Sequence, residues 1–129
     1  MPETLKTDYQ LQAAWYATIR RYLRFSKKNA RVAGVSTQQY QLLLAIIGIK
    51  ERDWAIISEL SELLCINNQA TLELCQQAER DELIRRRPID SRSHQTSFQL
   101  TEKGKMILDL ISQKDQPEFE RIQLNLLSL

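Results

Sequence analysis

Four arginines fall within residues 84–100, a short segment that has the pattern of a β-hairpin. Its turn is predicted at Asp90-Ser91-Arg92-Ser93, whose residue types favour turns. Pro88 must end the first strand or lie at a sheet edge, because proline cannot donate to a strand ladder. The arginines of this segment are Arg85, Arg86, Arg87 and Arg92. Guanidinium groups pair with phosphate oxygens, so the hairpin is suited to contact a nucleic-acid backbone.

The segment before the hairpin is predicted to be a helix over residues 68–81 that can enter a groove. The stripe expected to face the core is Thr71, Leu74, Cys75 and Ala78. The opposite face is Gln69, Glu73, Gln76 and Arg80. Asn67 or Asn68 can cap the first turn. With a shorter helix and a turn upstream, this arrangement is typical of a nucleic-acid reader.

Enzymatic chemistry finds little support in the sequence. The one histidine, His94, falls in the hairpin, where a polar loop residue is the usual explanation and a phosphate contact is the alternative. The sequence has no glycine-rich phosphate loop, no metal-spaced Cys/His cluster and no nucleophile–base pair. We therefore expect neither an enzyme nor a cofactor. Cys65 and Cys75 are predicted to be unpaired thiols of a reducing compartment.

The composition predicts a single, mainly helical domain over residues 1–129. Hydrophobic residues make up 43% and charged residues 26%, with only 3 Gly and 3 Pro. The net charge of +2 is small for a general polycation, so any nucleic-acid contact must come from a local concentration of charge. Neither a transmembrane run nor a signal peptide is recognised, which predicts a cytoplasmic protein without a membrane partner.

Apolar spacing and caps predict the other elements. A helix is expected over 8–32, a second after the capping sequence Ser36-Thr37-Gln38-Gln39, and a strand at 54–56. A short helix capped by Ser58 should follow. Its expected inner face is Leu60, Leu63 and Leu64.

Two helices are predicted at the end of the chain, one from Thr101 and another whose first turn contains Pro117. The second is so apolar along one side that it needs a partner surface. Because 8–32 and 101–129 flank the central module, we predict that they form a two-fold homodimer in which helices of both chains interleave.

This order of elements resembles the MarR family of winged helix-turn-helix transcription regulators. The matching pieces are Ala14-Trp15, then Ile57-Ser58-Glu59-Leu60 with Leu64, and finally Asp90-Ser91-Arg92-Ser93 with Leu100-Thr101-Glu102-Lys103-Gly104. The resemblance implies a mainly α fold with a short three-stranded wing sheet and terminal dimerisation helices. It also assigns residues 36–100 to a winged helix-turn-helix that binds double-stranded DNA.

By this resemblance Arg92, at the hairpin tip, is the best single candidate for DNA contact. Arginine at a wing tip can enter a narrow minor groove, where the negative potential is enhanced. Arg86, Arg87 and His94 are the other wing candidates. The alternative is a polar turn in which Asp90 pairs locally with Arg92.

The predicted recognition helix departs from the family, because Leu72 and Glu73 stand where Thr-Arg is common. Leu72 can touch a thymine methyl group, and Glu73 repels phosphates but can accept from a cytosine amino group. The amides that can pair with adenine edges are Asn68, Gln69 and Gln76. Glu82 replaces a helix-ending glycine, at a cost of about 1 kcal/mol if left-handed geometry is kept.

The resemblance further implies a small aromatic ligand between the dimer helices and the reading head. Candidate residues are Trp15, Tyr16, Arg20 and Tyr40, with Arg20 or Arg24 answering a carboxylate. Aromatic residues at helical spacing more often belong to a core.

The sequence thus predicts a homodimeric DNA-binding regulator, in this family more often a repressor than an activator. The alternative is a protein-interaction module on the same fold, because Glu73 and the small net charge weaken the case for DNA. A third hypothesis is an oxidant switch acting through Cys65.

Overall fold

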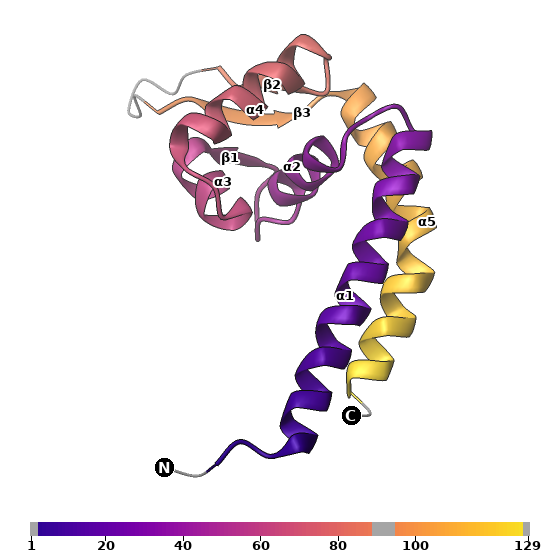
Figure 1. Cartoon of the computed structure of the whole chain (residues 1–129). Helices are drawn as coiled ribbons and strands as arrows, with labels where there is room; N and C mark the ends of the chain where they lie inside the picture. The colour runs from indigo at the N-terminus through magenta and orange to yellow at the C-terminus, as the bar shows by residue number, and fades with distance from the viewer. Residues whose placement is uncertain (1–2, 89–94, 128–129) are drawn as a thin grey trace.

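The computed structural model describes residues 3–88 and 95–127, which form a compact head and a long two-helix arm (Figure 1). The elements in chain order are α1 (Lys6–Val32), α2 (Thr37–Ile47), β1 (Trp54–Ile56), α3 (Ile57–Leu64), α4 (Asn68–Arg80), β2 (Ile84–Arg86), β3 (Ser97–Leu100) and α5 (Glu102–Leu127). The head contains α2 to β3. The arm consists of α1 and α5, which run side by side away from the head.

Helix α2 lies at the centre of the core, and its start is fixed by the predicted capping box. Ser36 Oγ accepts a hydrogen bond from the Gln39 N–H at 3.1 Å, and Gln39 Oε1 accepts one from the Ser36 N–H at 3.1 Å. The side chains of Leu42, Leu43 and Ile46 are fully buried. The other elements of the head therefore pack around α2.

The three strands form one antiparallel sheet in the order β1-β3-β2. Ala55 of β1 and Arg86 of β2 both pair with Phe98 of the central strand. Because side chains alternate along a strand, the face with Ala55, Phe98 and Leu100 is buried and the other points outward. The predicted mainly helical fold with a three-stranded wing sheet is confirmed.

The beginning of α5 is tied to the turn between α4 and β2. Thr101 Oγ1 donates to the Glu82 carbonyl oxygen at 2.6 Å and accepts from the Gly104 N–H at 3.0 Å. A Cβ on Gly104 would lie 2.1 Å from the Leu83 carbonyl oxygen, so this close approach requires glycine. Glu82 has a φ of 61°, which is the left-handed geometry considered for this position.

Pro117 does not begin a separate helix, as the sequence suggested, but lies inside the continuous helix α5. Proline lacks the N–H that would bond to the carbonyl of Gln113 four residues earlier. Gln113 is exposed, so water can satisfy that oxygen. Packing of α5 along α1 keeps the helix continuous across the proline.

The prediction for α3 is wrong in two details. The helix begins at Ile57, before Ser58, and Glu59 Oε1 accepts the Ile56 N–H at 3.1 Å. Leu63, expected on the inner face, is 57% exposed, whereas Leu60 is buried. Leu60 and Leu64 lie one above the other on the helix, and Leu63 falls beside that line.

Candidate nucleic-acid interface

Helix α4 keeps its two predicted faces. Thr71, Cys75 and Ala78 are buried, which fixes the opposite face outward. Asn67, not Asn68, caps the helix, because Asn67 Oδ1 accepts the Ala70 N–H at 2.7 Å. The side chain of Asn68 is therefore left exposed at the first turn.

The exposed face of α4 is an amide and carboxylate surface. Gln69 Nε2 donates to Glu73 Oε1 at 3.2 Å, so the carboxylate is hydrogen-bonded to an amide one turn away. Leu72 and Gln76 are half-buried beside them. All five residues proposed to read DNA bases thus lie on one helix, and the positions best placed to meet a groove carry no cation.

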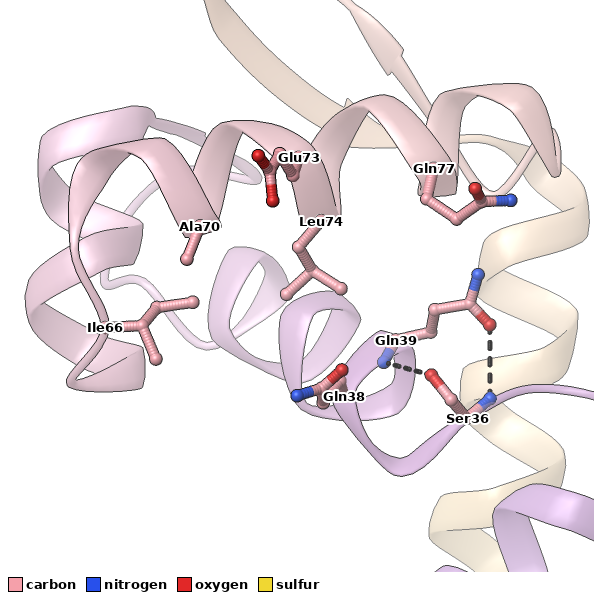
Figure 2. Close-up of a pocket in the computed structure, with 8 residues that line it drawn as sticks. All are labelled: Ser36, Gln38, Gln39, Ile66, Ala70, Glu73, Leu74 and Gln77. Atoms are coloured by element: carbon pink, nitrogen blue, oxygen red, sulfur yellow. Dashed lines mark hydrogen bonds between the residues drawn. The ribbon is translucent and has the colours of Figure 1, made fainter.

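A cavity of about 510 Å³ separates α4 from the beginning of α2 (Figure 2). Its apolar lining comes from Ile66, Ala70 and Leu74. Figure 2 shows Gln39 engaged with Ser36 at the edge of this space. Glu73 supplies the carboxylate of the lining, so the cavity begins at the face of α4 that was expected to read bases.

A second hollow, of about 270 Å³, lies where the starts of three elements meet. Ile57 and Ser58 come from the first turn of α3, and Asn68 comes from the first turn of α4. Thr96, just before β3, lines the other side. One N–H group at each helix start is already bonded, to Glu59 at α3 and to Asn67 at α4. The remaining N–H groups of the first turns favour anions, and Ser58 and Asn68 add donors. This corner is suited to a phosphate of a nucleic-acid backbone.

The three consecutive arginines of β2 and the wing differ in their surroundings. Arg86 turns toward α4, where its Nε lies 3.1 Å from a Glu79 carboxylate oxygen. Its guanidinium carbon also lies 5.6 Å from the ring centroid of Phe98. Arg87 lies over the indole of Trp54, at 4.3 Å. Arg85 is exposed and has no ion pair among the described residues.

Arg86 therefore joins α4 to the sheet through its ion pair with Glu79, a contact that the sequence does not reveal. Arg85 and Arg87 lie on the outward face of the sheet, because Arg85 pairs with Gln99 and the Arg87 N–H donates to the Ser97 carbonyl. The predicted tip residues Arg92 and His94 lie outside the described residues.

Solved structures resemble the whole arrangement of head and arm, although no protein-family model and no curated protein matches the sequence. A MarR-family protein from Bacillus stearothermophilus superposes with a TM-score of 0.80 at 19% identity, over 94% of this chain and 82% of that one. A mutant MarR from E. coli, complexed with operator DNA, gives 0.71 at 15% identity, over 97% and 88%. NadR in complex with 4-hydroxyphenylacetate gives 0.69 at 18% identity, over 98% and 86%.

The chain has the fold of the MarR-family transcriptional regulators. In this MarR fold the predicted ligand residues do not all come together. Trp15 and Tyr16 are exposed on α1, with ring centroids 6.2 Å apart, and the Arg20 guanidinium carbon lies 5.5 Å from the Tyr16 ring centroid. Tyr40 is buried in the head.

Tyr40 belongs to a buried polar cluster at the junction of the arm and the head. Asp115 of α5, only 2% exposed, accepts hydrogen bonds from Ser26 Oγ and Asn29 Nδ2, each at 2.6 Å. Tyr40 is a further hydrogen-bond partner of Asp115. Burial, and then the nearby carboxylate, raise the pKa of Tyr40, so its hydroxyl stays protonated. The cluster joins α1, α2 and α5.

Sequence reasoning missed this cluster because it predicted a separate helix beginning around Pro117, whereas one continuous helix carries Asp115. The signal was present in the spacing of the buried residues of α5. Leu108, Ile111 and Ile122 are buried, and Asp115 falls on the same helical stripe. A carboxylate on such a stripe must be satisfied by partners inside the protein.

Other chemistry is sparse in the described part of the chain. No group of metal-binding side chains is found there, and no helix there has the length and hydropathy needed to cross a membrane. Cys75 is buried, which raises the pKa of its thiol to about 12. Cys65 is exposed at the end of α3.

Proposed function

We propose that the protein is a transcriptional regulator that binds double-stranded DNA sequence-specifically as a homodimer. The observation that carries the proposal is the outward face of α4, placed beside the hollow at the starts of α3 and α4. The side chains proposed to read bases and the hollow that we assign to a backbone phosphate then meet on one surface. The operator complex of the similar E. coli protein supports the same use of the fold.

In this proposal α4 enters the major groove and the wing reaches the flanking backbone or minor groove. A two-fold dimer places two α4 helices in successive major grooves of a pseudo-palindromic site. Occupation of such a site in a promoter blocks transcription, so repression is the proposed outcome.

The arm supports the homodimer. Apart from Leu44, Leu63 and Ile66, the large apolar side chains exposed in the described chain lie on or beside α1 and α5. They include Leu11, Trp15, Phe119 and Leu124. Exposed apolar rows of this length are unfavourable in water and are covered when two such arms pair. The dimer is therefore part of the proposed DNA-binding unit.

We further propose that binding of a small aromatic acid releases the protein from DNA. A cavity of about 570 Å³ lies between α1 and α2, and Leu23, Arg24 and Lys27 line it from the α1 side. Two cations beside an apolar side chain suit an aromatic carboxylate. The complex of NadR with 4-hydroxyphenylacetate supports this ligand class.

The test is fluorescence anisotropy of a labelled random duplex at several low salt concentrations, followed by selection of bound duplexes from a random pool. Binding of micromolar or tighter affinity that weakens with salt is expected. Arg92→Ala should lower both the affinity and the salt slope without loss of the dimer. An unchanged affinity and slope in that variant would remove the wing-tip assignment.

The alternative from another class is a protein-interaction module that has lost DNA binding. The Gln69–Glu73 pair favours it, because α4 presents an acid where a DNA reader usually presents a cation. Absence of salt-sensitive binding to any duplex would support this alternative and contradict the proposed regulator.

A further inference from the structure

The outward face of the wing sheet carries a tryptophan between two arginines. The guanidinium carbons of Arg52 and Arg87 each lie 4.3 Å from the ring centroid of Trp54. Trp54 lies in β1 and Arg87 follows β2, so the contact spans the central strand β3. Both arrangements are in the range of favourable cation–π contacts.

The two arginines differ in how their charge is balanced. Arg52 forms an ion pair with Glu59 of α3, and this partner holds the pKa of the Glu59 carboxyl below its usual range. Arg87 has no carboxylate partner among the described residues. The charge of Arg52 is thus used inside the protein, whereas that of Arg87 remains available.

Stacking on Trp54 leaves the N–H donors of Arg87 able to bind a phosphate. A guanidinium that lies on an aromatic ring uses its flat face, while its five N–H donors point outward around its edge. A phosphate approaching in the plane of the guanidinium can therefore accept hydrogen bonds without breaking the stack. Arg87 is half-buried, so its side chain is already ordered before any ligand arrives.

Arg87 lies where it can meet the phosphate backbone of a bound nucleic acid. Arg87 and Ile56 both pair with Ser97, so the three form a row across the sheet. Ile56 and Thr96 line the hollow at the starts of α3 and α4. A nucleic-acid strand seated at that corner passes the end of this row.

We propose that Trp54 is a positioning residue for DNA binding, holding the Arg87 guanidinium by stacking so that it meets a backbone phosphate in an ordered state. Arg52 and Glu59 fix the indole from the side of α3. This inference rests on the proposed DNA-binding function and adds to it one residue of β1, Trp54, that no base or phosphate needs to touch.

The test is a double-mutant cycle measured by anisotropy over a range of salt concentrations. Arg87→Ala removes a phosphate contact, so the salt slope should fall by about 1. Trp54→Leu leaves the charge in place but disorders it, so affinity should fall about threefold to tenfold with an unchanged slope. In the Arg87→Ala background, Trp54→Leu should have no further effect on affinity.

The matched control is Arg85→Ala, which removes an exposed cation from the same face of the same strand. Its effect should add to that of Trp54→Leu, because the described cation–π contacts of the indole are with Arg52 and Arg87 and not with Arg85. Trp54→Phe, which keeps an aromatic face, should retain most of the affinity, and Arg87→Lys should behave like Trp54→Leu. The last variant keeps the test available even if Trp54→Leu fails to fold.

A second readout needs no DNA. In a Trp15→Phe background Trp54 is the only tryptophan, and Arg87→Ala should shift its fluorescence to the red by uncovering the ring. An additive cycle, an unchanged affinity in Trp54→Leu or an unshifted emission would each overturn the proposal. No salt-dependent binding by the unsubstituted protein would overturn the DNA-binding function as well.

Discussion

The head of the molecule buries Leu42, Leu43, Ile46 and Phe98 completely, whereas α1 buries only Ser26, Asn29 and Ala30 along its whole length. Both regions are rich in apolar residues, but the head buries its largest ones, whereas α1 leaves most of its apolar side chains exposed. The head is therefore stabilised by a core of its own, while the outer part of the arm depends on what packs against it. The two regions meet at the buried polar cluster around Asp115.

The largest effect is expected at that meeting point. Asp115→Ala would leave the hydroxyl of Ser26 and the amide of Asn29 buried without an acceptor, which costs about 3 kcal/mol of unfolding free energy. Urea denaturation followed by circular dichroism measures the loss. Asp109→Ala removes an exposed carboxylate from the same helix and should change stability little. Equal effects of the two substitutions would contradict the structural role of the cluster.

Substitutions in the arm should affect dimer formation more than the stability of the folded chain. Trp15→Glu places a charge in the exposed apolar row, and the proposed dimer should dissociate about 100-fold more readily because an aromatic anchor is lost. Analytical ultracentrifugation measures the change. Lys28→Glu introduces the same side chain at an exposed polar site of α1 and should leave the dimer nearly unchanged. A dimer insensitive to Trp15→Glu would place the interface elsewhere.

A smaller effect, of opposite sign, is expected at the turn between α4 and β2. Glu82 has a φ of 61°, so Glu82→Gly should raise the unfolding free energy by about 1 kcal/mol. Glu62→Gly, at an exposed position inside α3, should lower it by about 1 kcal/mol. Chemical denaturation of both variants compares the same substitution in two backbone conformations. Loss of stability in both would contradict the strain assigned to Glu82.

The smallest expected effect is in the chemical labelling of Cys75, which reports whether the core of the head opens. Cys75 should resist iodoacetamide at pH 8, because burial raises the pKa of its thiol to about 12 and the neutral thiol predominates. Exposed Cys65 should be modified readily. Mass spectrometry with and without urea separates the sites, and a Cys65→Ser variant isolates the buried one. Rapid labelling of Cys75 in the folded protein would show that the core opens.

Local signals made the head predictable. The capping box at Ser36, the inner stripe of α4 and the strand at 54–56 are each encoded within a few residues, and the structure contains all three. Pro117 shows the limit of such signals. A local rule favours a helix start there, but packing along α1, which is distant in sequence, decides for a continuous helix.

The candidate interface divides in the same way. The residues that face outward on α4 follow from helical periodicity. The contacts of Arg86 and Arg87 do not follow from periodicity, because their partners Glu79 and Trp54 lie on α4 and β1. Three identical side chains in a row carry no sequence signal that one joins two elements, another stacks on an indole and the third has no ion pair with the residues that the structure describes.

By itself the sequence determined the order of the elements up to β3, the core face of α4 and the cationic character of the wing, since these depend on spacing along one segment. Only the tertiary structure decided which of those cations remain available and how the arm is joined to the head. The physical reason is that pairing a guanidinium or satisfying the buried carboxylate of Asp115 requires groups that meet only when distant segments pack together.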